Sequence, residues 1–262
     1  MDYTPHVVAF LDILGFSEIC MKSDTSKEHR ESLKVIFDLC QTISSRFEHL
    51  KGKKEIKSMI VSDSIVLTLA LEGSKPTLQE LANFFLACGQ FQYYLGKSGF
   101  WLRGGISIGS LNVNFDQKQV VGPALIRAVN LEKKVARYPR IVVDPLVMAE
   151  HGIANASDFR DEINALYSTD GQRSLFEWRG FMDDWGESNI PKDVPLFIDF
   201  MRSVVGEDGN VGEVAESVAK GLRGAMEHYE KYRWLGDYIL AGHRQRYIGI
   251  SPFNDRLKVL LG

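Results

Sequence analysis

The sequence has few cysteines and no long apolar run, and these two features limit the compartment and the membrane association that we expect for the protein. Its cysteines, Cys20, Cys40 and Cys88, lack metal-binding spacing and leave one unpaired, so we expect buried thiols in a reducing compartment. No apolar run approaches the roughly 20 residues that span a membrane. The N-terminus lacks the basic and apolar regions of a signal peptide. We therefore expect a cytoplasmic protein that does not enter the membrane.

An excess of positive charge is also missing. The chain has 31 Lys and Arg against 34 Asp and Glu, a net charge of -3 over 262 residues. Broad binding to nucleic acid needs a basic surface, so nucleic acid is not an expected partner, although a local basic pocket for a triphosphate remains open. The six histidines include no pair at ligand spacing on one helix face, which argues against a zinc site.

The first half of the chain alternates between strand and helix patterns. The pattern predicts an α+β fold, in which an antiparallel-rich sheet carries helices on one face in a ferredoxin-like sandwich. The expected strands are residues 7–12, 55–61, 64–71, 101–108 and 140–143, a turn at Gly109 leads into 111–114, and the expected helices are 27–50, 77–97 and 124–136.

The pattern loosens after Asp144. Residues 167–171 and 183–193 are expected to be polar loops, and 195–205 and 211–233 are expected to be helices. We therefore divide the chain into a core, residues 1–145, and a C-terminal helical extension packed on it, residues 146–262.

Two aspartates stand at the ends of apolar runs. The string FLDILGFSEI, residues 10–19, places Asp12 at the end of the first run, and IKSMIVSDSIVLTL places Asp63 in a turn between two others. Carboxylates that meet at the ends of buried strands are suited to hold a hard cation beside a phosphate. Taken singly, Asp12 is also a plausible helix N-cap and Asp63 a plausible turn former.

Four segments in order resemble the class III nucleotidyl cyclases. They are residues 10–17, 62–66, 103–109 and 122–132, and the likeness extends over residues 5–144. The Gly122-Pro-Ala opening, the string at 138–142 and the irregular second half are closer to the pyrimidine cyclases of the bacterial Pycsar anti-phage system. This resemblance implies a lyase that cyclises UTP or, second, CTP. It also implies a homodimer with sites across its interface, two Mn²⁺ or Mg²⁺ ions per site, and a cyclic-nucleotide-sensing effector that responds to the product.

The resemblance also assigns roles to individual residues around the phosphates. Asp12 and Asp63 become the metal ligands, and Ile13 would lend a backbone carbonyl. The positions that match the triphosphate-binding loop are Leu14, Gly15 and Phe16, where backbone amides suit an anion. Arg103 is a candidate for a phosphate or interface contact, with a structural ion pair at the sheet edge as the equal alternative.

The sequence differs from the purine cyclases at two places in these motifs. Adenylyl cyclases have a lysine four residues before the second metal aspartate, where this chain has Met59, and a methionine offers no strong donor to a purine. Their transition-state asparagine and arginine match Ile126 and Asn130 in one alignment, and Asn130 and Lys134 in another. Asn130 is therefore the first candidate for the transition-state role and Arg127 the second.

Two other classes of function remain open from the sequence. A catalytically inactive cyclase-like domain would bind a nucleotide or regulate a partner, although both metal aspartates are present. A metal-dependent phosphodiesterase or nuclease would also use paired acids, although the chain lacks the histidine-rich clusters of many such sites.

Overall fold

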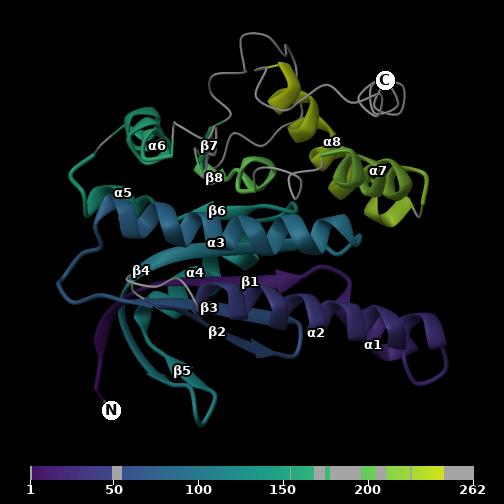
Figure 1. The fold of residues 1–262 in the computed structure, drawn as a ribbon, viewed down its shortest axis with the longest axis horizontal. Coiled ribbons are helices and arrows are strands. Elements are labelled where there is room, and N and C mark those ends of the chain that lie inside the picture. The colour runs from purple at the N-terminus through teal and green to yellow at the C-terminus, as the bar shows by residue number, and fades with distance from the viewer. Residues whose placement is uncertain are drawn as a thin grey trace.

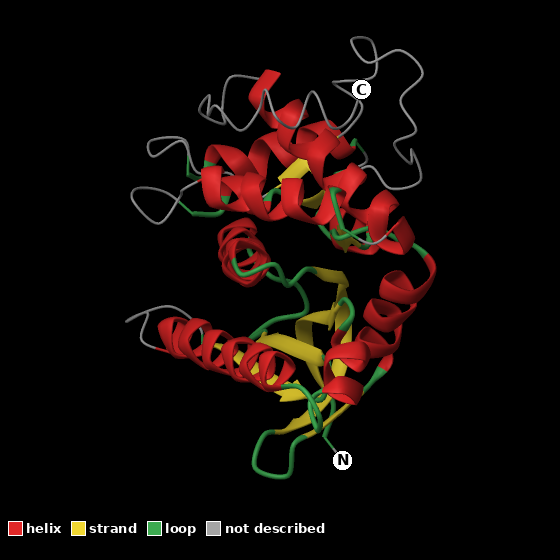
Figure 2. Cartoon of the chain, turned by 90° about the vertical axis from the view of Figure 1, so that its right-hand side faces the viewer, coloured by secondary structure: helices red, strands yellow, loops and turns green. Residues whose placement is uncertain are grey.

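The computed structural model describes residues 2–48, 55–153, 155–167, 175–177, 196–204, 211–224 and 226–244. In these residues a twisted sheet has helices on both sides (Figures 1 and 2). The strands lie in the order β2-β3-β1-β4-β6-β8-β7, and β5 pairs with β4 outside this row. The pairings are antiparallel except that of β4 with β6. The predicted α+β class with an antiparallel-rich sheet is confirmed.

The bounds of the elements are as follows. The strands are β1 Thr4–Ile13, β2 Ile56–Val61, β3 Ser64–Ala70, β4 Leu102–Asn114, β5 Gln119–Val121, β6 Ile141–Val143, β7 Leu175–Glu177 and β8 Leu196–Ile198. The α-helices are α1 Phe16–Lys22, α2 Lys27–Glu48, α3 Leu78–Lys97, α4 Pro123–Lys134, α5 Pro145–Ala149, α6 Ala156–Ala165, α7 Val211–Leu222 and α8 Tyr229–Arg244. Two 3-10 helices are η3 Phe200–Arg202 and η5 Met226–His228.

Alternation along β1 separates the two faces of the sheet. Val7 and Leu11 are buried in the large core that α2 and α3 complete, whereas Val8 belongs to a separate cluster with Ala124 and Ala128 of α4. Successive side chains of a strand point to opposite faces. The two long helices therefore share one face, as predicted. The prediction of helices on one face only is wrong for α4, which packs on the other face.

The first half follows the predicted elements closely. α3 begins after Thr77, whose side chain accepts a hydrogen bond from the Glu80 amide while Glu80 bonds back to the Thr77 amide. This capping box satisfies two amides that the first helical turn leaves open. The last two residues of the helix predicted over 27–50 lie outside the described residues.

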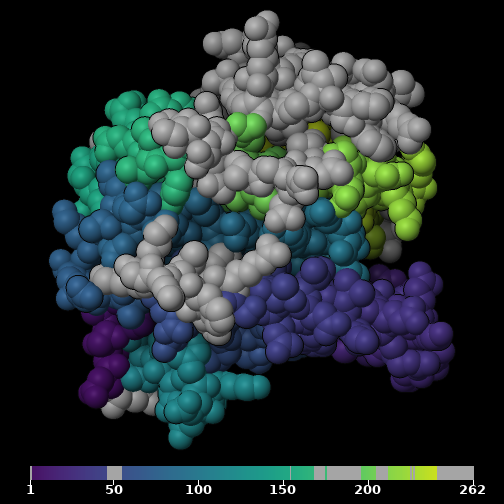
Figure 3. All heavy atoms as spheres, in the orientation of Figure 1, coloured from purple at the N-terminus to yellow at the C-terminus, as the bar shows by residue number. Residues whose placement is uncertain are grey.

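The predicted break at Gly109 is wrong. Gly109 has a φ of 145°, yet it stays in register opposite His6, and β4 runs on without interruption. Its end pairs with β5 to form a hairpin that projects from the body of the molecule (Figures 1 and 3). The segments before and after Gly109 are thus one long strand.

Two predictions for the second half are also wrong. Residues 196–198 form β8 and are fully enclosed, and a 3-10 turn follows, where a helix over 195–205 was expected. A short apolar run fits a buried strand as well as a helix. The helix expected over 211–233 is divided into α7 and α8, which fold back so closely that a Cβ on Gly221 would lie 2.1 Å from the Tyr232 ring.

The part of the chain after residue 145 shares a core with the first half. Trp101 and Tyr93 pack in one cluster with Phe197 and with Trp234 of α8. β8 and β7 continue the sheet beyond β6, so the extension contributes strands as well as helices. The predicted loop over 183–193 and most of the one over 167–171 lie outside the described residues. None of the described helices combines the length and apolar character needed to cross a membrane.

Candidate active site

Asp12 and Asp63 lie at the same edge of two paired strands. Asp12 stands opposite Ser64 in the β1–β3 ladder, and the Ile13 amide donates a hydrogen bond of 2.9 Å to the Asp63 carbonyl. The two-residue turn before Ser64 is tight, with Ser62 in the left-handed region at a φ of 57°. The fold therefore brings together the two carboxylates that the sequence singled out.

A partly buried ion-pair network includes Asp12. Arg103 Nε lies 2.9 Å from Asp12 Oδ2 and 2.7 Å from Glu132 Oε1, and the Glu132 side chain is almost fully buried. Burial, together with the negative charges of Asp12 and Asp63, raises the pKa of Glu132, and the nearby Arg103 opposes this shift. Three carboxylates and one guanidinium thus form one electrostatic unit.

Glu132 is a member of this unit that the sequence argument did not assign. It was used only to align the helix that carries Asn130. The sequence does carry one signal for Glu132, because an acid on an otherwise apolar face of a helix needs a charged partner. Arg103 supplies that partner, so the structural alternative given for Arg103 holds in this structure.

The donor set suits a hard divalent cation. Carboxylate and carbonyl oxygens are the ligands that Mg²⁺ prefers, and Asp12, Asp63 and the Ile13 carbonyl offer those atoms. Among the described residues no group of three or more His, Cys, Asp or Glu side chains forms a complete metal-binding cluster. The protein would therefore supply few ligands, and a bound phosphate or water would complete the coordination, as is usual for Mg²⁺.

Of the three backbone amides expected to face a triphosphate, at least one is used within the chain. The Leu14 amide donates to the Trp101 carbonyl at 2.9 Å and is occupied. Gly15 adopts a φ of 79°, and a Cβ placed there would meet no atom within 4 Å. Phe16 opens α1 with its ring buried against Phe37. The space next to the Cα of Gly15 is thus open, whereas the Phe16 ring belongs to the core.

Met59 lies in β2 with its side chain buried. It packs in the cluster that contains Val8, Val66 and the α4 residues Ala124 and Ala128. A thioether in this setting is a weak acceptor and donates nothing. The position at which adenylyl cyclases have a lysine is therefore apolar in this fold.

α4 presents Asn130 and Glu132 in opposite directions. Glu132 faces Arg103 beneath the helix, whereas Asn130 is exposed. Two residues are separated by about 200° around an α-helix. Asn130 therefore points away from the Asp12 and Asp63 carboxylates of its own chain.

Arg127 is held in a structural contact. Its Nε and Nη2 donate to the two carboxylate oxygens of Asp144 at 2.8 and 2.9 Å. Burial alone would raise the pKa of Asp144, but hydrogen bonds from Arg127, the Leu146 amide and Ser107 hold this pKa below its usual range. A bidentate pair of this kind fixes a guanidinium in place. The contact explains Arg127 without a catalytic role.

Comparison with known proteins gives likenesses only at the level of three-dimensional structure. No family model and no curated protein matches the sequence. The adenylyl cyclase CyaB from P. aeruginosa is similar with a TM-score of 0.43 and 15% identity, over 56% of this chain and 80% of that one. A class III adenylyl cyclase-like ATP-binding protein from Pseudomonas aeruginosa has a TM-score of 0.43 and 8% identity, over 61% of this chain and 37% of that one.

A third similar structure is an adenylate/guanylate cyclase/hydrolase from Silicibacter pomeroyi. Its TM-score is 0.38 at 14% identity, over 76% of this chain and 96% of that one. With TM-scores below 0.5, the function proposed for this chain rests on its own residues and their arrangement.

Proposed function

We propose that the protein is a class III nucleotidyl cyclase that converts a pyrimidine nucleoside triphosphate, UTP first and CTP second, into the 3′,5′-cyclic monophosphate and pyrophosphate. The observation that carries the proposal is that Asp12 stands opposite Ser64 at the end of the β1–β3 ladder, while the Ile13 amide donates to the carbonyl of Asp63 in the turn before β3. The proposal is also supported by the spacing of the two aspartates in the sequence, which resembles that of the two metal-binding motifs of that family.

The chain's own residues would prepare the site for the reaction. Asp12, Asp63 and the Ile13 carbonyl would hold two Mn²⁺ or Mg²⁺ ions, which when bound activate the ribose 3′-hydroxyl and neutralise the leaving pyrophosphate. Arg103 holds Asp12 in a defined orientation through its 2.9 Å contact. The amides beside Gly15 and Phe16 would bind the phosphate oxygens. Positioning and charge stabilisation would account for most of the lowered barrier.

A dimer would complete the site. Asn130 points away from the carboxylates of its own chain, so it can meet such a pair only on another copy. In a symmetric dimer each chain would then supply the carboxylates of one site and the Asn130 helix of the other. The proposed biological role is the synthesis of a second messenger for anti-phage defence, which a cyclic-nucleotide-sensing effector detects.

The experiment that tests the activity is incubation with each of the four triphosphates and Mn²⁺. Formation of a cyclic pyrimidine monophosphate and pyrophosphate supports the proposal. Preference for ATP would overturn the assignment of the base, and cleavage of nucleic acid or of a cyclic nucleotide would indicate a hydrolase. Tight nucleotide binding without turnover would favour the inactive, regulatory alternative. The presence of both aspartates, Asp12 and Asp63, argues against that alternative.

A further inference from the structure

A small cavity lies where the start of α8 meets the loop that follows β1. Leu14 and Gly15 line it from that loop, and His228, Lys231 and Tyr232 line it from η5 and α8. Its volume is about 50 Å³, enough for roughly three to five waters. A phosphate group, with its four oxygens, is of similar size. The C-terminal extension thus forms one wall of a cavity at the loop expected to bind phosphates.

Packing fixes the start of α8 against this loop. Trp234 and Leu235, one turn after Lys231, are buried in the same cluster against which Leu14 packs. The Trp234 ring also stacks on that of Tyr138, with 6.1 Å between the ring centres. Residues three and four apart lie on one face of a helix. Lys231 therefore stands on the face of α8 that meets the loop, and its backbone is held in place.

The charge of the cavity suits an anion. None of the described residues that line it is acidic, and Lys231 brings an ammonium group. Glu18 of α1 is an acid nearby, and its pKa is lowered mainly by a hydrogen bond from Lys22 at 2.6 Å and less by His228. The negative charge of Glu18 is therefore already paired with a lysine of its own helix.

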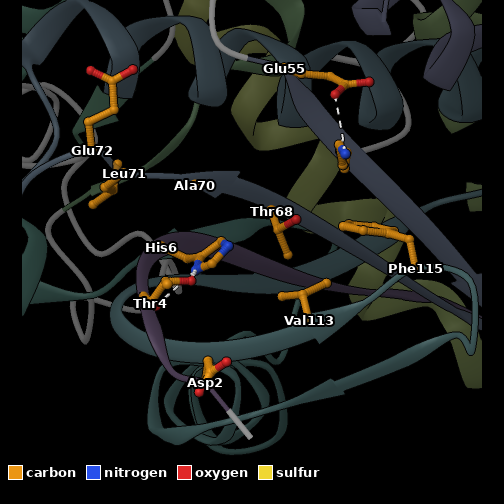
Figure 4. A pocket seen from close by; sticks show the side chains of 11 residues that line it. Asp2, Thr4, His6, Glu55, Thr68, Ala70, Leu71, Glu72, Val113 and Phe115 are labelled. Atoms are coloured by element: carbon orange, nitrogen blue, oxygen red, sulfur yellow. Dashed lines mark hydrogen bonds and ion pairs between the residues drawn. The ribbon is translucent and has the colours of Figure 1, made fainter.

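The larger groove at the other end of β1 has the opposite character (Figure 4). Its volume is about 490 Å³, and Asp2, Glu55 and Glu72 line it together with one lysine, Lys57. Lys57 lies 3.3 Å from Glu55 Oε2, and the acidic rim would repel a phosphate. Of these two cavities, the one beside Gly15 is therefore suited to an anion.

The cavity is within reach of a triphosphate held at the aspartates. Gly15 is three residues after Asp12, at most about 11 Å along the chain. The arginines nearest the motifs, Arg103 and Arg127, are engaged by carboxylates. Lys231 is a cation that the fold brings to this end of the loop, where the outer phosphates would lie.

We propose that Lys231 binds the β- and γ-phosphates of the substrate, so that the C-terminal extension forms part of the active site. The inference rests on the proposed cyclase function. A lysine binds phosphate oxygens as a point charge. In the reaction the ribose 3′-oxygen bonds to the α-phosphorus and its proton passes to water. The bond from the α-phosphorus to the bridging oxygen breaks, and its electron pair moves onto the pyrophosphate. An ammonium group at that end would stabilise the charge that develops there.

The first test measures turnover in Lys231 variants. Lys231→Met should lower kcat/KM for UTP and for CTP by the same factor, roughly 10- to 100-fold, because a charge-assisted hydrogen bond to a group that both substrates share is lost. Lys231→Arg should keep most of the activity, since it retains a cationic donor. The matched control is Lys220→Met, an exposed lysine of α7 outside the cavity, which should leave the rates unchanged. An unchanged kcat/KM in Lys231→Met would overturn the inference and leave the proposed function standing.

Product inhibition separates a phosphate contact from a general disturbance of the site. The inhibition constant of pyrophosphate should rise in Lys231→Met by roughly 10- to 100-fold, because the lost contact is to the phosphates that leave. That of the cyclic monophosphate should stay the same, since this product lacks the β- and γ-phosphates. An equal weakening of both would show that the substitution disturbs the whole site, and would overturn the assignment of Lys231 to the outer phosphates.

Inorganic tripolyphosphate gives a test that needs neither turnover nor a metal. Its addition to the wild-type protein in buffer without divalent ions should shift the amide NMR signals of Gly15 and Lys231 and leave that of Lys220 in place. The shifts should weaken in Lys231→Met, whose fold is checked by circular dichroism. If the wild-type protein cyclised no triphosphate, the proposed function would fail, and an absence of shifts at Lys231 would reject this inference separately.

Discussion

At the scale of single residues, the site is defined by how charges are paired. Arg103 forms ion pairs with both Asp12 and the buried Glu132, and Arg127 forms one with Asp144. The two arginines closest to the motifs are therefore both engaged within the chain. The proposed metal ligands are the carboxylates of Asp12 and Asp63, and Asn130 is an exposed polar group on α4.

The first prediction at this scale concerns the two aspartates. Asp12→Ala or Asp63→Ala should abolish cyclisation of every triphosphate, because each change removes a carboxylate that a divalent cation needs. Turnover is measured by pyrophosphate release, and gel filtration verifies that the assembly is unchanged. Activity at the wild-type level in either variant would refute the proposed site.

The second prediction separates the structural and catalytic effects of Arg103. Arg103→Met leaves Glu132 buried without its counter-charge and should lower the free energy of unfolding by about 1–3 kcal/mol, a reduced value since a third of the side chain is exposed. Adding Glu132→Gln should restore much of this stability, which urea unfolding would measure. Cyclisation should remain impaired in the double variant, because Asp12 still lacks its orienting partner. Full recovery of activity together with stability would show that Arg103 acts only through folding.

At the scale of elements, the sequence predicted the first half well and the second half poorly. The helix over 77–97 has both a clear period and a capping box at Thr77, and β2 and β3 flank a short polar turn, so local signals agree with the fold. β8 is only three residues long and is buried, so its type is decided by pairing with β6 and β7. Such tertiary contacts leave no periodic signal in the sequence.

The difference between local signals and tertiary contacts also explains which candidate residues the sequence indicated. Asp12 and Asp63 follow apolar runs, so the sequence alone indicates them as candidates, whereas the Glu132–Arg103 contact joins residues far apart in the chain. The placement of α4 on the opposite face depends on packing against β4, which no local pattern records. The groove of about 490 Å³ is lined by residues of strands β1 to β4, among them Lys57. It forms only when these strands pair, so no local pattern in the sequence predicts it.

The contact of α4 with β4 gives the third prediction. A Cβ on Gly105 would lie 2.5 Å from the Ala128 carbonyl oxygen and 2.5 Å from Leu131 Cβ. Gly105→Ala should therefore push α4 outward, lower the free energy of unfolding by about 1–3 kcal/mol, and reduce turnover by displacing Asn130. Gly73→Ala is the control, because a Cβ there meets no atom within 4 Å. Equal stability of the two variants in thermal unfolding would show that α4 tolerates the shift.

The fourth prediction concerns a buried acid on α8. Burial raises the pKa of Asp237 to about 6, and Arg233 at 4.0 Å opposes the shift only weakly. The folded protein thus binds this proton more tightly than the unfolded chain, whose aspartate titrates near about 4. Stability is retained below that pH and is lost as the pH rises through about 6, by on the order of 2 kcal/mol.

Replacement of Asp237 tests this sign directly. Asp237→Asn should raise the melting temperature at pH 7.5 and have little effect at about pH 3, below the pKa of the unfolded aspartate, where the carboxyl is mostly protonated in both states. Calorimetry at the two pH values measures the difference. A variant that is less stable than wild type at pH 7.5 would mean that the pair with Arg233 outweighs the cost of burial.

At the scale of the whole molecule, the orientation of α4 indicates whether one chain or two would form the proposed site. Glu132 faces the carboxylates of its own chain and Asn130 faces outward, about 200° away around the helix. No rotation of the Asn130 side chain bridges that separation while Glu132 keeps its contact with Arg103. If both groups act in one reaction, they must come from different copies of the chain.

The last prediction tests that conclusion by mixing inactive variants. Asp63→Ala and Asn130→Ala are each expected to be inactive, and a mixed dimer has one site with both defects and one with neither. Free exchange of equal amounts should therefore restore about a quarter of the wild-type activity, because half of the dimers are mixed and each has one intact site. The control mixes Asp12→Ala with Asp63→Ala, which belong to the same side, so each site of a mixed dimer carries one defect and no activity returns. Exchange is verified with differently tagged chains. If tagged chains exchange and the first mixture stays as inactive as the control, the site lies within one chain and Asn130 takes no part in it through a partner.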